Sequence, residues 1–183
     1  MKQIAELLFE ARMLKDLKRS GYAFLGAGSE SIASHCFTTA FICFVMARLT
    51  PGIDGERLTA MALVHDMAEA RTGDFNYVQK RYADVHESRA IAHLTENIPF
   101  AADIRSLMDE FNAGDTPEAQ LVRDADQLSF ILELKKLKDT GAAFPDQWLE
   151  VITARLKTDL GRHLAAGILE TRWDAWWLNG YTE

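Results

Sequence analysis

The spacing of its apolar residues constrains the fold of this chain more than any other feature. They recur at helical intervals between turn and cap signals, and no stretch shows the alternation of apolar and polar residues that marks a half-buried strand. The 183 residues are 48% hydrophobic, which is enough apolar material for one core. The sequence therefore predicts an all-α chain, and we expect a single domain over residues 1–183.

Helix-start and helix-stop residues divide the chain into about seven helices. The strongest start is Thr116-Pro117-Glu118, because threonine can cap a helix, proline suits its first turn and glutamate suits its dipole. Glycine and proline set most of the ends. We expect helices over about residues 3–18, 29–48 or 31–48, 55–71, 76–97, 99–113 and 116–140. One or two closing helices should follow over about 145–179, with a break near Gly161.

Composition argues against several classes of protein. The net charge of −7 argues against binding nucleic-acid polymers, because that binding depends on a basic surface. The longest apolar run, Ala40 to Ala47, is shorter than the roughly 20 residues that cross a bilayer, and the charged N-terminal residues do not resemble a signal peptide. We therefore expect a cytoplasmic protein that does not enter a membrane. Cys36 and Cys43 lie in an apolar stretch and are expected to be small buried side chains.

Two polar residues, His65 and Asp66, interrupt an otherwise apolar helical segment. A buried carboxylate is costly unless it is paired, hydrogen-bonded or bound to a metal, so this pair requires a partner. Glu69 follows His65 by four residues and lies on the same side of a helix, where it could handle a proton at a metal-bound water. Asp74, just past Gly73, is a second candidate for that role.

Two further residues complete a candidate metal site. His35 also lies in an apolar helical stretch, and Asp126 is four residues from both Val122 and Phe130, which indicates an inward-facing carboxylate. Asp124 is its rival, since spacing alone separates the two poorly. Two imidazoles and two carboxylates suit Mn, Co, Ni, Fe or Zn and leave positions open for water or substrate. For any single histidine, a hydrogen-bonded core residue is the simpler explanation.

These residues resemble the pattern of the HD-domain superfamily, in which a histidine on one helix, a His-Asp pair on a later helix and a further aspartate hold a metal. Here the pattern corresponds to His35, His65-Asp66 and Asp126. Over about residues 10–140 the chain is more closely similar to the 5′-deoxynucleotidase branch, whose final ligand lies in an Ala-Asp-x-Leu segment. That segment matches Ala125 to Leu128 and favours Asp126. The other matching segments are Arg19-Ser20-Gly21, Glu30 to His35, His65 to Ala70 and Thr72-Gly73-Asp74.

The resemblance implies a single HD-domain helical bundle with its metal-binding core over about residues 10–140. It also implies a phosphohydrolase that uses one divalent metal ion per chain to remove the 5′-phosphate of a (deoxy)ribonucleoside monophosphate. In that branch a loop arginine holds the phosphate of the substrate, and the corresponding residue here is Arg19. The acidic catalytic residues of the branch correspond to Glu69 and Asp74. The branch usually places tryptophan after the arginine, whereas the nearest aromatic residue here is Tyr22, a candidate substrate-binding residue. A homodimer is a further implication of the branch.

Two other functions stay open on the sequence. An HD-type di-iron oxygenase would require more histidine ligands, and the remaining histidines lack metal-type neighbours: His86, His93 and His163. A non-catalytic regulatory protein would keep the same metal for stability. The C-terminal tryptophans are expected to pack in the core or at a dimer interface rather than to stack on bases. They are Trp173, Trp176 and Trp177.

Overall fold

The computed structural model of the chain describes residues 1–143 and 145–181, which form helices joined by turns and loops, without a β-sheet. The longer helices are α1 (Lys2–Met13), α3 (Ile32–Leu49), α4 (Gly55–Val64), α6 (Glu87–Leu94), α7 (Ala101–Ala113), α8 (Pro117–Asp139), α9 (Pro145–Thr153) and α10 (Asp159–Glu170). Shorter pieces are α2 (Tyr22–Leu25), α5 (Glu69–Thr72), α11 (Ala175–Leu178) and two 3-10 helices, Gln79–Arg81 and Asn179–Tyr181. The all-α prediction is confirmed.

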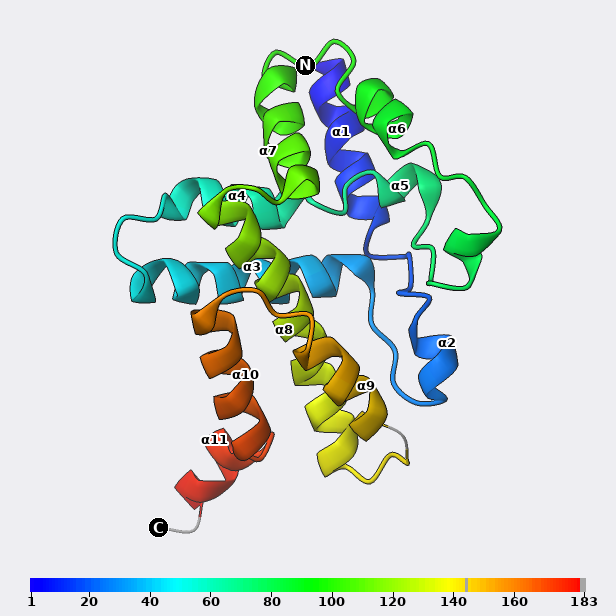
Figure 1. Ribbon diagram of the computed structural model, residues 1–183. Helices are drawn as coiled ribbons and strands as arrows, with labels where there is room; N and C mark the ends of the chain where they lie inside the picture. Colours follow the sequence, from blue (N-terminus) through cyan, green and yellow to red (C-terminus); the bar gives the residue numbers. More distant parts are fainter. Residues whose placement is uncertain (144, 182–183) are drawn as a thin grey trace.

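Helices α3 and α8 cross at the centre of the molecule, and the other helices pack around that crossing (Figure 1). α4 packs beside α3 and also contacts α7 and α8, while α9 and α10 pack against α8. Fully buried side chains fill the space between α3, α4 and α8, among them Met46, Leu58, Met61, Leu128 and Ile131. Burial stabilises the fold by roughly 1.5–3 kcal/mol for each such side chain. The packing fixes the crossing at which α3 and α8 bring their polar residues together.

Capping side chains fix where the central helices begin. Ser31, Asp54 and Thr116 each accept a hydrogen bond from the backbone N–H three residues ahead, at the starts of α3, α4 and α8. Caps of this kind contribute about 1 kcal/mol each. Pro117 occupies the first turn of α8, which runs to Asp139. The helix predicted over residues 116–140 is confirmed.

The helix predicted over residues 55–71 is wrong in one respect, because it breaks at the His-Asp pair. α4 ends at Val64, and the Met67 N–H then donates to the Val64 carbonyl while the Glu69 N–H donates to the Asp66 carbonyl, both at 3.0 Å. These bonds span three residues rather than four, so the chain leaves the α-helical path before α5 begins. His65 and Asp66 therefore lie at the end of a helix and not inside one.

Two other predicted helices are shorter than expected. α1 ends at Met13, because the next residues turn back to pair with the segment before α3, where the Arg19 N–H donates to the Glu30 carbonyl at 3.0 Å. The helix predicted over residues 76–97 forms regularly only as α6, and the residues before it include the exposed Tyr82. The residues before α6 are mostly exposed and bury little apolar surface. They form a loop that borders the cavity described below.

The break predicted near Gly161 lies instead at residues 154–158. Gly161 is inside the first turn of α10, whose N-cap is Thr158. A side chain at Gly161 would collide with the carboxylate of Asp124 on α8. Glycine is therefore required by close packing between helices and not by a turn.

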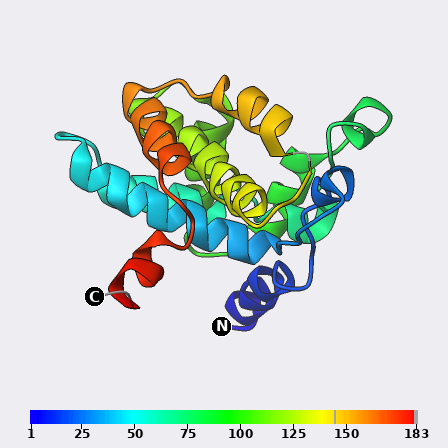
Figure 2. The same cartoon turned by 90° about the horizontal axis from the view of Figure 1, so that it is seen from below.

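One face of α3 is exposed, while α8 and α10 lie on its other side (Figure 2). Phe37, Phe41 and Phe44 follow one another along the exposed face. By length and composition α3 could cross a membrane, with a mean hydropathy of 1.5, although core helices of soluble proteins pass the same test. The apolar part of this helix is therefore longer than the run Ala40 to Ala47 indicated. Trp176 is 83% exposed, so packing in the core was a wrong expectation for this residue.

Candidate metal centre

His35 is fully buried near the start of α3, where α3 crosses α8. Its Nδ1 lies 3.1 Å from the hydroxyl of Ser129 on α8, which orients the ring. Its Nε2 lies 3.0 Å from Oδ1 of Asp126 and 3.7 Å from Oδ2 of Asp66. His35 therefore faces both carboxylates of the predicted site.

The end of α4 determines the tautomer of His65. The side chain is 1% exposed, and its Nδ1 donates a hydrogen bond to the carbonyl oxygen of Ala62 at 2.8 Å. Because a carbonyl oxygen can only accept, Nδ1 carries the proton of the neutral ring and Nε2 carries a free lone pair. That Nε2 lies 3.3 Å from Oδ2 of Asp66. The ring thus presents an unprotonated nitrogen to the site.

The four predicted metal ligands meet where α3, α8 and the end of α4 come together. One ligand atom each from His35, His65 and Asp126 lies within 4.8 Å of the other two, and Asp66 lies close to both imidazoles. The histidine side chains are buried, whereas those of Asp66 and Asp126 are 21% and 24% exposed. A cation held here would have nitrogen ligands on its inner side and an open side toward solvent.

Both Nε2 atoms are buried without a hydrogen bond to any group that the structure describes, in residues 1–143 and 145–181. The approach of His35 to Asp126 lacks hydrogen-bond geometry despite its short distance. A buried polar atom without a partner costs about 1–3 kcal/mol. Two such nitrogens facing two carboxylates are a ligand set that divalent transition metals satisfy. The residues present therefore fit a metal ion.

The charges at the centre also suit a cation. Burial lowers the pKa of His35, which keeps its ring neutral, as a metal ligand must be. Burial opposes ionisation of Asp126 too, but the positive charge of Arg19 favours it, and the pKa of Asp126 lies well below its ordinary range. Both groups are thus in the protonation state that binds metals.

The two aspartates of α8 have different surroundings. Asp126 faces the imidazoles, whereas Asp124 is 1% exposed and faces the start of α10. Asp124 accepts hydrogen bonds from the backbone N–H groups of Lys157 and Thr158, both at 2.8 Å, and from the Thr158 hydroxyl at 2.6 Å. The structure thus places Asp126 with the other predicted ligands and gives Asp124 a role in packing, a distinction that spacing left open.

The loop between α1 and α2 carries Arg19 to the edge of the centre. Its Nη1 lies 4.0 Å from Oδ1 of Asp126, and its guanidinium lies over the ring of Phe130. Asp74 holds this loop, because its Oδ2 accepts hydrogen bonds from the Ser20 backbone N–H at 2.6 Å and from the Ser20 hydroxyl at 3.3 Å. Asp74 is thus brought to the arginine loop, and its predicted catalytic role stays a prediction.

A cavity of about 520 Å³ opens beside the centre, a size typical of small-molecule sites. His65, Asp66 and Asp126 line it, together with Glu69. Burial, with the negative charges of Asp66 and Asp74, raises the pKa of Glu69 to about 9. Glu69 is therefore placed where a bound substrate would meet a carboxyl group that keeps its proton.

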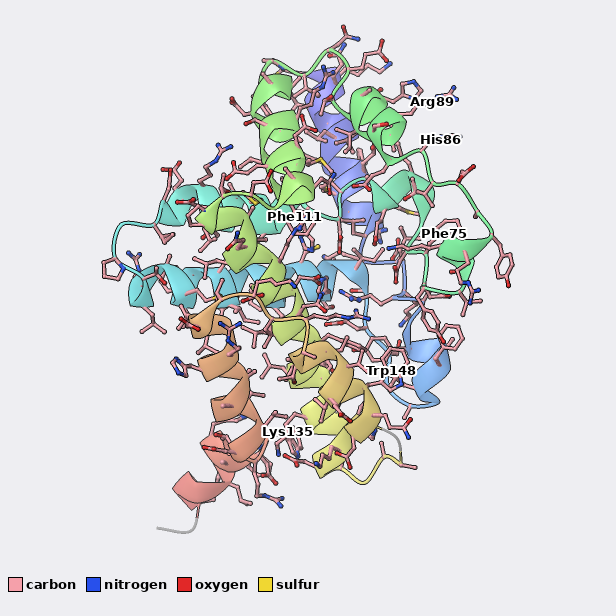
Figure 3. All side chains as sticks on the ribbon, viewed as in Figure 1. Phe75, His86, Arg89, Phe111, Lys135 and Trp148 are labelled. Atoms are coloured by element: carbon pink, nitrogen blue, oxygen red, sulfur yellow. The ribbon has the colours of Figure 1, made fainter. Side chains whose placement is uncertain are left out.

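The cavity walls contain residues that the sequence analysis missed. Phe111, at the end of α7, lies with its ring 5.1 Å from that of His65, and Phe75 comes from the loop after α5 (Figure 3). Asn112 completes this part of the lining. No spacing rule identifies these residues, because the contacts arise between segments far apart in the sequence.

Tyr22 and Glu30 form a buried polar pair beside Arg19. Tyr22 is 7% exposed, packs edge-on against Phe130, and donates a hydrogen bond from its hydroxyl to Oε2 of Glu30 at 3.3 Å. Binding of substrate by Tyr22 stays a prediction, since its hydroxyl faces an acid in the interior. Glu30 was not predicted as a site residue, although it begins a segment that matches the 5′-deoxynucleotidase branch.

Glu30→Gln is expected to remove a pH dependence of stability. Burial raises the pKa of Glu30 from 4.5 to about 7. The contribution of protonated Glu30 to the free energy of unfolding is therefore complete below about pH 4.5 and is lost as the pH rises through about 7. In the metal-free protein, the melting temperature of the variant minus that of the wild type should therefore increase between pH 5 and pH 8. Glu150→Gln, at an exposed position, is the control, and parallel curves for Glu30→Gln and wild type would refute the expectation.

Comparisons with known sequences find relatives of this chain. A family model described as HD domain matches residues 11–167. The 5′-deoxynucleotidase hdd1 of Schizosaccharomyces pombe is 34% identical over 131 residues, which are 66% of this chain and 65% of that protein. The 5′-deoxynucleotidase HDDC2 of Xenopus laevis is 30% identical over 140 residues, 72% of this chain and 68% of its own length. The chain thus spans just under two thirds of the yeast relative.

Solved structures share the fold. A protein from Pyrococcus horikoshii OT3 is 30% identical with a TM-score of 0.74, over 90% of this chain and 98% of its own. A structure titled as a predicted metal-dependent phosphohydrolase, from Magnetospirillum magnetotacticum MS-1, has a TM-score of 0.68 over 92% and 93% of the two chains. At 22% identity, that second match shows the fold alone.

Proposed function

Because this chain belongs to the HD-domain family, we propose that it is a metal-dependent phosphohydrolase that removes the 5′-phosphate of (deoxy)ribonucleoside monophosphates. One observation carries the proposal. The Nε2 atoms of His35 and His65, buried and without a hydrogen-bond partner among the described residues, face Asp66 and Asp126 beside a cavity of small-molecule size. The substrate class is supported by relatives that are named 5′-deoxynucleotidases.

We assign one divalent ion per chain to His35, His65, Asp66 and Asp126, and the ligand types favour Mn, Co, Ni, Fe or Zn. When bound, such an ion polarises the phosphoryl group and lowers the pKa of a coordinated water. The partly exposed carboxylates lie on the side that opens to the cavity. Substrate and water therefore approach from that side, and the buried histidines exclude water from the other.

Arg19 is assigned to the phosphate. A guanidinium grips phosphate oxygens with two parallel hydrogen bonds, and Arg19 lies at the edge of the centre next to Asp126. An anionic phosphate requires a local positive charge on this protein, because the chain as a whole carries a net charge of −7. Asp74 orients Arg19 indirectly by holding Ser20, so we assign Asp74 a positioning role.

Glu69 is assigned to proton transfer. It lines the cavity beside Asp66, and burial raises the pKa of its carboxyl group and so favours the protonated form. A protonated carboxyl group there can donate its proton to the 5′ oxygen that leaves the phosphorus. Phe75 and Phe111 line the same cavity and offer aromatic surface to the nucleoside.

The di-iron oxygenase gains no support from the structure. His86, His93 and His163 are all exposed, and the acid and imidazole groups that converge within the described residues are those of the centre itself. A regulatory protein would not require the cavity beside the ligands, so catalysis is the better explanation of the arrangement.

We also propose a cytoplasmic homodimer. Contiguous exposed apolar surface marks sites of association, and the Phe37, Phe41 and Phe44 face of α3 provides such a surface. Light scattering after size-exclusion chromatography would give the mass of the particle, and a monomer at micromolar concentration would contradict the dimer.

The function is tested by phosphate release from ribo- and deoxyribonucleoside 5′-monophosphates, using chelated protein resupplied with Mn, Co, Ni, Zn, Fe or Mg. We expect metal-dependent release, and its loss in His65→Ala but not in His163→Ala, a control at an exposed histidine on α10. Full activity and metal content in His65→Ala would overturn the proposal. Metal-linked thermal stabilisation with no release from any substrate would favour the regulatory alternative.

A further inference from the structure

Cys36 follows His35 on α3 and lies close to two of the proposed metal ligands, His65 and Asp66. It is 6% exposed and belongs to the apolar cluster that contains Met67 and Ala68 from the turn after α4. Its sulfur is nevertheless not surrounded by apolar groups alone. A ligand atom from each of Cys36, His65 and Asp66 lies within 4.8 Å of the other two.

A second observation shows that this group can take a ligand. Nε2 of His65 is buried without a hydrogen bond among the residues the structure describes, and it lies 3.3 Å from Oδ2 of Asp66. An ion bound to this nitrogen and this carboxylate can therefore complete its ligand set with His35 and Asp126 or with Cys36. Thiolate sulfur prefers Zn and other soft cations, whereas carboxylate oxygen alone prefers hard ones.

We propose that Cys36, His65 and Asp66 form an alternative site for a thiophilic divalent cation such as Cd²⁺ or Zn²⁺. Bonds of about 2.3 Å to sulfur and 2.0 Å to nitrogen require the three atoms to move closer together than they lie in the metal-free chain. Binding releases the thiol proton to solvent and leaves the oxidation state of every group unchanged. Because His65 and Asp66 belong to both sets, an ion held by the thiolate displaces the ion of the proposed catalytic centre.

Cadmium-113 NMR of the protein loaded with Cd²⁺ alone tests this site without any turnover. A sulfur ligand moves the cadmium resonance strongly downfield of the range for nitrogen and oxygen ligands. We expect the downfield resonance in the wild type and in Cys43→Ser, and its loss in Cys36→Ser. Cys43 is the matched control, since it is a fully buried cysteine on the same helix two turns further on.

The affinity for Cd²⁺ should fall in parallel. Loss of an outer partner of a metal ligand already costs about 10-fold to 100-fold in affinity, so Cys36→Ser should weaken binding at least about tenfold. A wild-type resonance in the nitrogen and oxygen range overturns the inference even if Cys36→Ser does not fold. A wild-type enzyme that hydrolyses monophosphates but shows no sulfur-shifted resonance refutes this site alone, while the shifted resonance without hydrolysis refutes only the proposed function.

Discussion

Asp126→Asn is expected to abolish metal-dependent phosphate release, with a loss of at least about a hundredfold. The substitution keeps the shape of the side chain but removes the negative charge that lies 3.0 Å from His35 and 4.0 Å from Arg19. A metal ion contributes several kcal/mol of charge stabilisation in reactions of this type, and each 1.4 kcal/mol is a tenfold change in rate. Phosphate release, together with metal content by mass spectrometry after gel filtration, measures the effect.

The rival aspartate supplies the control for this experiment. Asp124→Asn changes the same residue type two positions away on the same helix, but its carboxylate faces α10. Assayed well below its unfolding temperature, it should keep its metal and its activity. If Asp124→Asn lost the metal while Asp126→Asn retained it, the two roles assigned from the structure would be reversed.

Asp124→Ala is expected to produce the largest loss of stability. Its carboxylate is almost fully buried and accepts three hydrogen bonds from Lys157 and Thr158. Hydrogen bonds to a charged group contribute about 1.5–3 kcal/mol each, and the buried donors would lose their partner. We expect a fall of at least about 3 kcal/mol in the free energy of unfolding, which lowers the melting temperature by roughly 6–12 °C in a chain of this size.

Thermal unfolding of the metal-free proteins measures this loss, so that changes in metal binding do not contribute. Asp109→Ala is the matched control, because Asp109 is an exposed aspartate on α7, and surface substitutions of this kind usually stay within about 0.5 kcal/mol of the wild type. If Asp124→Ala had the same melting temperature as Asp109→Ala, the hydrogen bonds from Asp124 to the start of α10 would not contribute to stability.

Local chemistry predicted α3, α7 and α8 well. Threonine followed by proline placed the start of α8, and the helix predicted over residues 99–113 does end at a glycine, Gly114, which has a φ of 70°. These signals act within a few residues, so they are visible in the sequence. Gly161 has no such local role, because its need for a bare backbone comes from Asp124 on another helix. Its appearance as a helix break was therefore misleading.

The site could be predicted in its residues but not in its geometry. Buried polar side chains within apolar segments identified His35 and the His-Asp pair, and the family resemblance separated Asp126 from Asp124. Periodicity treated His65 and Glu69 as neighbours on one helix, but α4 ends between them. The hydrogen bond from His65 to Ala62 and the contact of His35 with Ser129 depend on the end of a helix and on a crossing between helices. Spacing within one helix contains neither piece of information.

The end of α4 at Val64 also has an electrostatic consequence. The peptide dipoles of a helix leave about half a negative elementary charge at its C-terminus, and His65 and Asp66 follow that end directly. A cation bound there is attracted by the helix as well as by its ligands. The attraction requires no ionisable side chain, so it persists at acidic pH, where carboxylates begin to take up protons. Because α4 ends at Val64, its backbone peptide groups themselves attract a cation to the site.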